Sequence, residues 1–204
     1  GCTSVHVQQG QFCAYLLDEP QLVADCETDM QNTVSVPVTV KCCIGIDNSI
    51  DDAADYDFLE KFVSAIAATG CTKFIIHARK AWLKGLSPKE NREIPPLRYD
   101  MAARIKQAYP HLTIILNGGI TTTEQITDHL RTFDGVMIGR EAYQNPYMLA
   151  VWENALYGTP LPQRDAIARA MGTYIEEQQD TTGSHGTCSA FIMVCAAHGS
   201  GGRF

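Results

Sequence analysis

The fold class is decided by the stretch Leu112-Thr-Ile-Ile-Leu-Asn-Gly-Gly119, together with the stretch Asp134-Gly-Val-Met-Ile-Gly-Arg140 that follows it. Each is a short, nearly continuous apolar run with glycine at its end, which is typical of a strand in a parallel sheet. Residues 121–132 lie between them and predict a helix, with Thr122 or Thr123 as its cap near Glu124. The two stretches therefore predict a strand, a helix and a further parallel strand.

The same alternation extends upstream. Two more buried strands are predicted, over residues 34–41 and 73–77, and three more helices, over residues 12–33, 55–69 (ended by Gly70) and 98–109 (stopped by Pro110). From about residue 145 only helices are expected, the clearest over residues 166–179. A complete (β/α)8 TIM barrel takes about 250 residues. We therefore expect an α/β chain, the later half of a (β/α)8 TIM barrel followed by the start of an all-helical domain.

Composition excludes several classes of protein. The 204 residues are 45% apolar and 19% charged, which fits a folded core and not a disordered tail or a coiled coil. No apolar stretch approaches 18 residues, so no transmembrane span is expected. Eight cysteines without a CxxC pair favour reduced, mostly buried thiols over a disulfide framework or a zinc ribbon. We expect no bound metal.

The charge of the chain is polarised. The net charge is −7, yet residues 73–106 contain nine of the sixteen Lys and Arg residues and only three acidic residues. This basic window also contains Trp82, and it suits contact with a phosphate backbone, with stacking of a base on the indole. The alternative is a solvated loop with ordinary ion pairs.

The chemistry is expected at the ends of the strands, where parallel barrels place their sites. Glycine after each of the last two strands, with an arginine, predicts a phosphate site, because bare backbone N–H groups can approach phosphate oxygens. A simple turn at the first glycine pair is the alternative. At the two earlier strand ends the alternatives to a functional role are a lysine whose side chain extends to solvent and a histidine with ordinary hydrogen bonds. The strand-end residues are Lys41, His77, Asn117, Gly118, Gly119, Gly139 and Arg140.

The motifs resemble a known family. The stretch His77-Ala-Arg-Lys-Ala-Trp-Leu-Lys-Gly-Leu-Ser-Pro-Lys-Glu-Asn-Arg-Glu-Ile-Pro-Pro-Leu97, here called the signature loop, closely resembles the corresponding loop of the DusA-type tRNA-dihydrouridine synthases. Further matches are residues 38–41, 44–47, 110–113, 117–120 and 134–146, and the segment that begins with Gly1-Cys2. The resemblance runs from residue 1 to about residue 179.

The resemblance implies a function and roles for residues. The family reduces uridine to 5,6-dihydrouridine in the D-loop of tRNA, with FMN bound in the barrel and NADPH as reductant. Cys2 would donate the proton to C5 of the uracil. By resemblance, FMN would be held by Lys41, His77, Asn117, Gly118, Gly119, Gly139 and Arg140, and tRNA by Arg79, Lys80, Lys89, Asn91 and Arg92.

Three positions depart from the family pattern. Thr3 stands where the family has proline after the catalytic cysteine. Cys43 stands where the family has arginine, two positions after the flavin lysine, and Cys13 stands where glycine is usual. Thr3 and Cys43 favour a first alternative to the enzyme, a non-catalytic remnant that still binds tRNA but no longer holds FMN. A second alternative is another FMN-dependent barrel oxidoreductase. The signature loop speaks against the second.

The sequence also predicts the organisation of the chain. Residues 1–147 are expected to form an FMN-binding TIM-barrel catalytic domain that lacks its first strands. Residues 148–204 are expected to begin a helical tRNA-binding domain, and the resemblance fades after about residue 180. Because the sequence begins with Gly1, we expect it to be a fragment whose own N-terminus, with any targeting segment, lies upstream. The expected protein is a monomer in the cytoplasm, or alternatively in an organelle.

Overall fold

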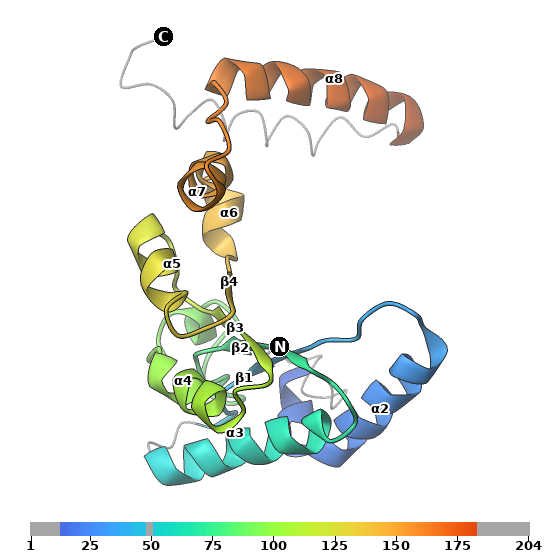
Figure 1. Cartoon of the computed structure of the whole chain (residues 1–204), viewed down its shortest axis with the longest axis vertical. Coiled ribbons are helices and arrows are strands. Elements are labelled where there is room, and N and C mark those ends of the chain that lie inside the picture. The colour runs from blue at the N-terminus through green and yellow to red at the C-terminus, as the bar shows by residue number, and fades with distance from the viewer. Residues whose placement is uncertain (1–12, 48–50, 183–204) are drawn as a thin grey trace. The chain divides into compact units, whose positions relative to one another are not determined.

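The computed structural model describes residues 13–47 and 51–182. The chain divides into two compact units, Gly1–Met137 and Ile138–Phe204. The first unit is built on a four-stranded parallel sheet in the order β1-β2-β3-β4, which is also the chain order (Figure 1). The strands are β1 (Val40–Cys43), β2 (Lys73–His77), β3 (Thr113–Asn117) and β4 (Gly135–Met137). The predicted α/β class with a parallel sheet is confirmed.

Each parallel connection contains one α-helix. A parallel pair cannot be joined by a tight turn, so the chain must cross back before the next strand. The crossings are made by α3 (Asp52–Ala67), α4 (Tyr99–Ala108) and α5 (Thr123–His129), with the short η2 (Glu90–Arg92) inside the second connection. Ahead of β1 lie η1 (Cys13–Asp18) and α2 (Pro20–Thr33).

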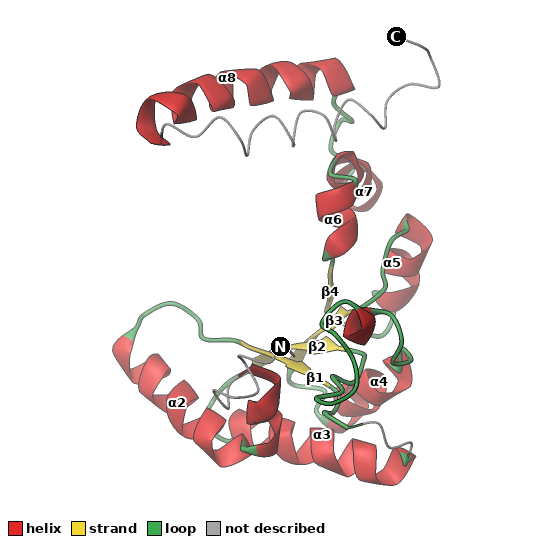
Figure 2. Cartoon of the chain, turned by 180° about the vertical axis from the view of Figure 1, so that it is seen from behind, coloured by secondary structure: helices red, strands yellow, loops and turns green. Residues whose placement is uncertain are grey.

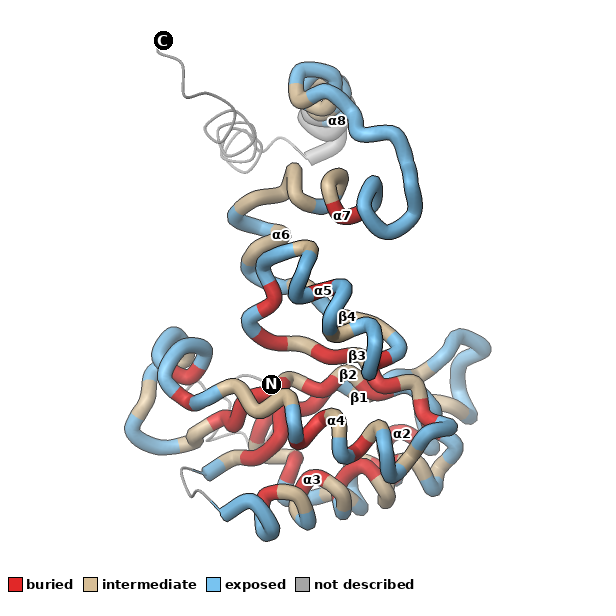
Figure 3. Tube along the Cα trace, turned by 60° about the vertical axis from the view of Figure 1, so that its left-hand side comes forward, coloured by how far each residue is buried: buried red, intermediate tan, exposed pale blue. Residues whose placement is uncertain are grey.

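The core of the first unit lies between the sheet and the helices α3 and α4, which cover the same side of the sheet (Figure 2). Phe74 of β2 and Ile114 of β3 are fully buried, as are Val63 of α3 and Ile105 of α4. Figure 3 shows this burial along the strands and on the inner side of both helices. Side chains alternate along a strand, so the residues between these core positions face the other side.

Two predicted elements were wrong in extent. The strand expected over residues 34–41 starts only at Val40, and Val36 is 66% exposed. Pro37 has no N–H to donate to a ladder, so the β-branched run before it stays outside the sheet. The helix expected over residues 12–33 is divided between η1 and α2. The division falls at Pro20, which suits the first turn of a helix but not its interior.

The starts of the helices have local causes. The Asp51 carboxylate accepts hydrogen bonds from the N–H groups of Ala53 and Ala54, both at 3.1 Å, so α3 begins earlier than predicted. Thr122 caps α5, as one of the two predicted alternatives. Its partner in the capping box is Gln125, because the side chain three positions into the helix reaches back to the cap.

In the second unit every described element is a helix: α6 (Arg140–Gln144), α7 (Tyr147–Tyr157) and α8 (Arg164–Thr182). Trp152 of α7 is buried, and Gly158, at φ +70°, ends that helix. The turn after α7 is held by Tyr147, whose hydroxyl donates to the carbonyl of Pro162 at 2.9 Å while its ring lies under the guanidinium of Arg164. Among the described residues, every element after β4 is therefore a helix, and the first of these helices begins at Arg140.

Four cysteines of the described part of the chain, Cys26, Cys42, Cys43 and Cys71, carry free thiols. Cys42, Cys43 and Cys71 are buried, as expected of small apolar residues. Cys26 is exposed on α2, so the expectation of burial was wrong there.

Candidate functional site

The strand register brings three predicted cofactor residues onto one face of the sheet. Cys43, His77, Asn117 and Met137 are successive partners across the four strands. Lys41 lies two residues before Cys43 and therefore on the same face. This face is opposite to the one that α3 and α4 cover. We call it the open face, and define it by these five residues.

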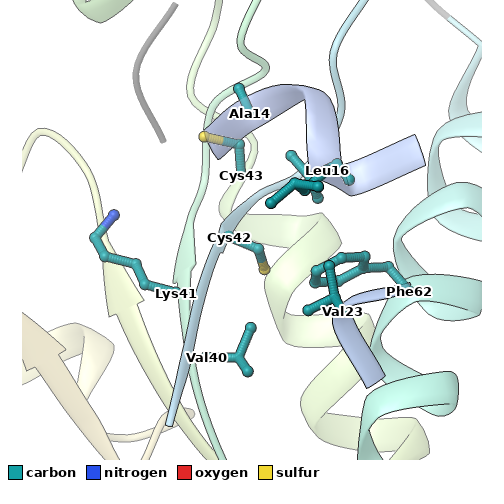
Figure 4. Close-up of a pocket in the computed structure, with 9 residues that line it drawn as sticks. Ala14, Leu16, Val23, Val40, Lys41, Cys42, Cys43 and Phe62 are labelled. Carbon is teal, nitrogen blue, oxygen red and sulfur yellow. The ribbon is translucent and has the colours of Figure 1, made fainter. Parts of the chain in front are cut away.

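Lys41 is exposed on the open face. Figure 4 shows that its side chain and that of Cys42 leave β1 on opposite sides. The predicted strand end was displaced, because β1 continues to Cys43. The ammonium is thus not buried, and it needs no anion from the protein to offset a desolvation cost.

His77 contacts the thiol of Cys43 across β1 and β2. The Sγ atom lies 3.7 Å from the ring Nδ1 atom of the half-buried His77. Burial raises the pKa of the Cys43 thiol above its ordinary value. On the helix-covered side, burial raises the pKa of the neighbouring Cys42 to about 12. Both groups therefore stay protonated at neutral pH, and the thiol beside the histidine is neutral.

Asn117 holds the carboxyl end of the sheet together. Its side-chain amide donates to the carbonyl of Met137 at 2.8 Å, and its own backbone carbonyl accepts from the N–H of Ala78 at 2.8 Å. The sequence predicted this residue as a cofactor contact and did not suggest the cross-strand bond. The bond to Met137 fixes the direction of the amide at the edge where a cofactor is expected.

The glycine pair after β3 is required by packing. Gly118 and Gly119 have φ angles of +128° and +67°, which favour glycine. A Cβ atom on either would lie within 3 Å of the Leu97 side chain, at 2.9 Å and 2.6 Å respectively. The Tyr99 hydroxyl donates to the carbonyl of Gly118 at 2.8 Å. The chain thus bends at the glycine pair, and the signature loop closes on β3 at the same place.

Three of the five predicted tRNA residues are buried in the signature loop. The guanidinium of Arg79 donates to the carbonyl of Glu93 at 2.8 Å and to that of Pro95. Lys80 is buried, and its ammonium binds Asp47 at 3.0 Å and also Asp55. Lys80 thus has two carboxylate partners and the Nη1 atom of Arg79 has two carbonyl partners, which offsets much of the cost of burying two basic residues.

Asn91 is the third predicted tRNA residue that is buried in the loop. Its Oδ1 atom accepts from the N–H of Trp82 at 2.7 Å, and its Nδ2 atom donates to the carbonyl of Trp82 at 2.9 Å. Lys89 and Arg92, in contrast, are exposed. The sequence did not predict that the Tyr99 hydroxyl binds the carbonyl of Gly118. It also did not predict that Lys80 pairs with Asp47 and Asp55, because no local pattern links residues so far apart in sequence.

For two sets of predicted site residues, a place beside the open face stays a prediction. Gly139 and Arg140 are exposed and begin α6 in the second unit. That these two residues and the glycine pair bind the same phosphate group stays a prediction. Cys2 and Thr3 lie outside the described residues, and their roles stay predictions as well.

A cavity of about 240 Å³ lies on β1, between η1, α2 and α3 (Figure 4). It is smaller than typical ligand pockets of roughly 300–1,000 Å³, and its lining is apolar apart from Lys41. The cavity therefore lacks the polar groups that a nucleotide needs. Its lining residues are Ala14, Leu16, Leu17, Val23, Val40, Lys41, Cys42, Cys43 and Phe62.

Comparison with known proteins decides the family. The family model of the dihydrouridine synthases (Dus) matches residues 1–189. The chain belongs to this family. The resemblance predicted from the signature loop is thereby confirmed.

Curated relatives of the chain support the same conclusion. It is 54% identical over 178 residues to the tRNA-dihydrouridine(20/20a) synthase of Shewanella oneidensis, covering 86% of this chain and 52% of that protein. The corresponding protein of Vibrio vulnificus is 54% identical over 181 residues, with 87% and 54% covered. That of Escherichia coli O6:H1 is 51% identical over 181 residues, again with 87% and 54% covered. The chain spans about half the length of these relatives.

Metal and membrane features were searched in the described part of the chain. Within residues 13–47 and 51–182, no group of three or more His, Cys, Asp and Glu side chains is arranged to hold a metal ion. In the same residues no helix is both long and apolar enough to cross a membrane.

Proposed function

We propose that this chain is part of an enzyme that reduces uridine to 5,6-dihydrouridine in the D-loop of tRNA, with FMN as bound cofactor and NADPH as reductant. The observation that carries the proposal is the shared open face of Lys41, His77 and Asn117. Parallel α/β folds bind ligands at the carboxyl ends of their strands. The relatives named tRNA-dihydrouridine(20/20a) synthases support the substrate class and suggest uridines near position 20.

The described residues fit FMN. Lys41 offers an exposed ammonium on the open face, where it can stabilise negative charge on a flavin ring. Gly118 leaves the backbone bare of a side chain beside His77. Gly139 and Arg140 are proposed to bind the phosphate of the cofactor. FMN, when bound, supplies the hydride that is added at C6 of the uracil.

The proton is proposed to come from the chain itself. Cys2 would protonate C5 of the uracil, because a thiol with a pKa near about 8.5 is mostly protonated at neutral pH. The uracil must leave its stack to reach the open face, and the free energy of unstacking is low in an RNA loop.

The contact with tRNA is proposed for the exposed part of the signature loop. Lys89 and Arg92 would meet the phosphate backbone. Arg79, Lys80 and Asn91, which are buried in the loop, would act on tRNA by shaping the surface that presents those two residues. This division refines the sequence prediction, in which all five had the same role.

The remaining predictions complete the proposal. A barrel whose later half is formed by residues 1–147, and a helical tRNA-binding domain that begins at residue 148, fit the sheet and the helices that follow it. A monomer in a reducing compartment such as the cytoplasm fits the free thiols of Cys42, Cys43 and Cys71.

A titration with FMN tests the proposal on the 204-residue chain. Lys41→Gln should weaken FMN binding, followed by quenching of flavin fluorescence. Lys73→Gln is the matched control, because Lys73 is an exposed lysine on the same face but at the amino end of β2. Equal effects of both substitutions would contradict a site at the carboxyl ends. Incubation with tRNA, FMN and NADPH, followed by mass spectrometry of the nucleosides, tests the reduction itself.

Binding of tRNA without reduction is the second candidate function. It is favoured by the internal bonds of the signature loop, which hold Lys89 and Arg92 at the surface with no contribution from a cofactor. A chain that shifts tRNA on a gel but binds no FMN would support this candidate over the first.

A further inference from the structure

The imidazole of His77 is held from two sides. On one edge of the ring, Nδ1 lies 3.7 Å from the Sγ atom of Cys43, its partner in the sheet register. On the other edge lies Gly118, where a Cβ atom would be 3.0 Å from the ring Cδ2 atom and 3.4 Å from Nε2. The bare glycine therefore leaves just enough room for the ring in this orientation, in which the thiol lies at Nδ1.

The chemistry of the pair sets the direction of the hydrogen bond. Cys43 is only 4% exposed, and its burial disfavours the thiolate. A protonated thiol is a weak donor and a weaker acceptor, whereas an unprotonated imidazole nitrogen is a good acceptor. The S–H group therefore donates, and Nδ1 accepts.

We propose that Cys43 is a positioning residue, whose thiol donates to Nδ1 of His77 and so holds the neutral imidazole in the tautomer with its proton on Nε2. The proposal deepens the proposed function and rests on it for one consequence. An Nε2–H group on the open face is a donor, suited to an anionic or carbonyl oxygen of the cofactor.

Nitrogen NMR of the histidine ring tests the tautomer without any cofactor. The 204-residue chain is labelled with ¹⁵N-histidine and measured near pH 8.5, above the ordinary histidine pKa of about 6.5. His77 should show an unprotonated Nδ1 and a protonated Nε2. Cys43→Ala should move the signals toward a mixture of tautomers, while Cys43→Ser, which retains a donor, should restore the original pattern. If the alanine variant folds poorly, the wild-type chain and Cys43→Ser still decide between the two tautomers.

Cys42→Ala is the matched control. Cys42 precedes Cys43, is equally buried at 4% exposure, and faces the helix-covered side of β1. It should leave the His77 signals unchanged. A proton on Nδ1 in the wild-type chain, or an unchanged His77 in Cys43→Ala, would overturn the proposal.

The affinity for FMN tests the consequence. Cys43→Ala should weaken FMN binding roughly fivefold to tenfold, the value of one hydrogen bond, and Cys43→Ser should restore most of it. A tautomer shift with unchanged FMN affinity would remove the role of His77 toward the cofactor. A wild-type chain that binds no FMN would refute the proposed function, while the NMR result on the cofactor-free chain would still decide the role of Cys43.

Discussion

The side-chain amide of Asn91 and the backbone of Trp82 form a reciprocal pair of hydrogen bonds, with N–H to Oδ1 at 2.7 Å and Nδ2 to carbonyl at 2.9 Å. This geometry imitates the pairing between two strands. It closes the signature loop on itself and lets the rest of the loop remain at the surface.

Replacing Asn91 should therefore open the loop. Asn91→Ala leaves two backbone groups of Trp82 without partners, at a cost of about 2–3 kcal/mol. Urea unfolding and hydrogen exchange over residues 78–97 measure this, with the exposed neighbour Lys89→Ala as control. An unchanged exchange rate at Trp82 would show that other contacts hold the loop.

Lys80 should contribute to the stability of the fold and should affect tRNA affinity only through that stability. Lys80→Met leaves the buried carboxylate of Asp55 without its cation, which costs about 3 kcal/mol or more. Adding Asp55→Asn should recover part of this loss, because the orphaned charge is then removed. Thermal unfolding and tRNA gel shifts are compared. A fall in tRNA affinity at unchanged stability would instead indicate direct contact of Lys80 with tRNA.

The exposed basic residues should control tRNA affinity and its salt dependence. Lys89→Ala with Arg92→Ala should weaken binding and lower the slope of log affinity against log salt by roughly two, one for each phosphate contact. Filter binding between low and moderate salt measures the slope. Lys61→Ala with Arg131→Ala removes two exposed charges elsewhere on the first unit and should change the slope less. Equal slopes for the two pairs would remove the loop from the tRNA site.

Gly119 should tolerate no side chain. Gly119→Ala adds a Cβ atom 2.6 Å from Leu97 at a φ of +67°, so a steric clash is added to backbone strain. Gly85→Ala is the control, because Gly85 has a similar φ of +86° with nothing within 4 Å of the added atom. We expect about 1–2 kcal/mol for Gly85→Ala and several kcal/mol for Gly119→Ala in chemical denaturation. Similar values would show that Leu97 moves aside.

Asp134 should make the free energy of unfolding depend on pH in the acidic range. Burial raises the pKa of its carboxyl group, but hydrogen bonds from the Lys106 ammonium and from the N–H of Ile114 outweigh it, and the net pKa lies below its ordinary value. The folded state thus binds the proton more weakly than the unfolded state. The stabilisation is present above the ordinary Asp pKa of about 3.9 and is lost as pH falls through the lower folded value.

Unfolding of Asp134→Asn as a function of pH measures this. The stability difference from wild type should be constant near neutral pH and shrink below about pH 4. Asp57→Asn, a change at an exposed carboxylate on α3, is the control. A difference that persists in acid, below both the unfolded and the folded pKa, would assign the effect to shape and not to charge.

Much of the first unit could be predicted from local pattern. The runs that became β2, β3 and β4 are apolar and bounded by breakers, and the helices between them have regular apolar spacing. The error at residues 34–41 has a local cause as well, because the β-branched residues around Pro37 were given more weight than its missing N–H. The strand-end prediction succeeded for His77 and Asn117 as positions, since parallel strands end at the same edge of a sheet, whereas Lys41 lies two residues before the end of β1.

The sequence by itself determined the α/β class, the family and the residues at the strand ends, because these depend on composition, spacing and short-range order. Only the tertiary structure decided which basic residues of the signature loop are buried, that Cys43 meets His77, and that Gly118 and Gly119 must accommodate Leu97. Each of those contacts joins residues that are far apart along the chain or on different elements. Their pairing depends on strand register and on how distant segments pack, and no local propensity encodes it.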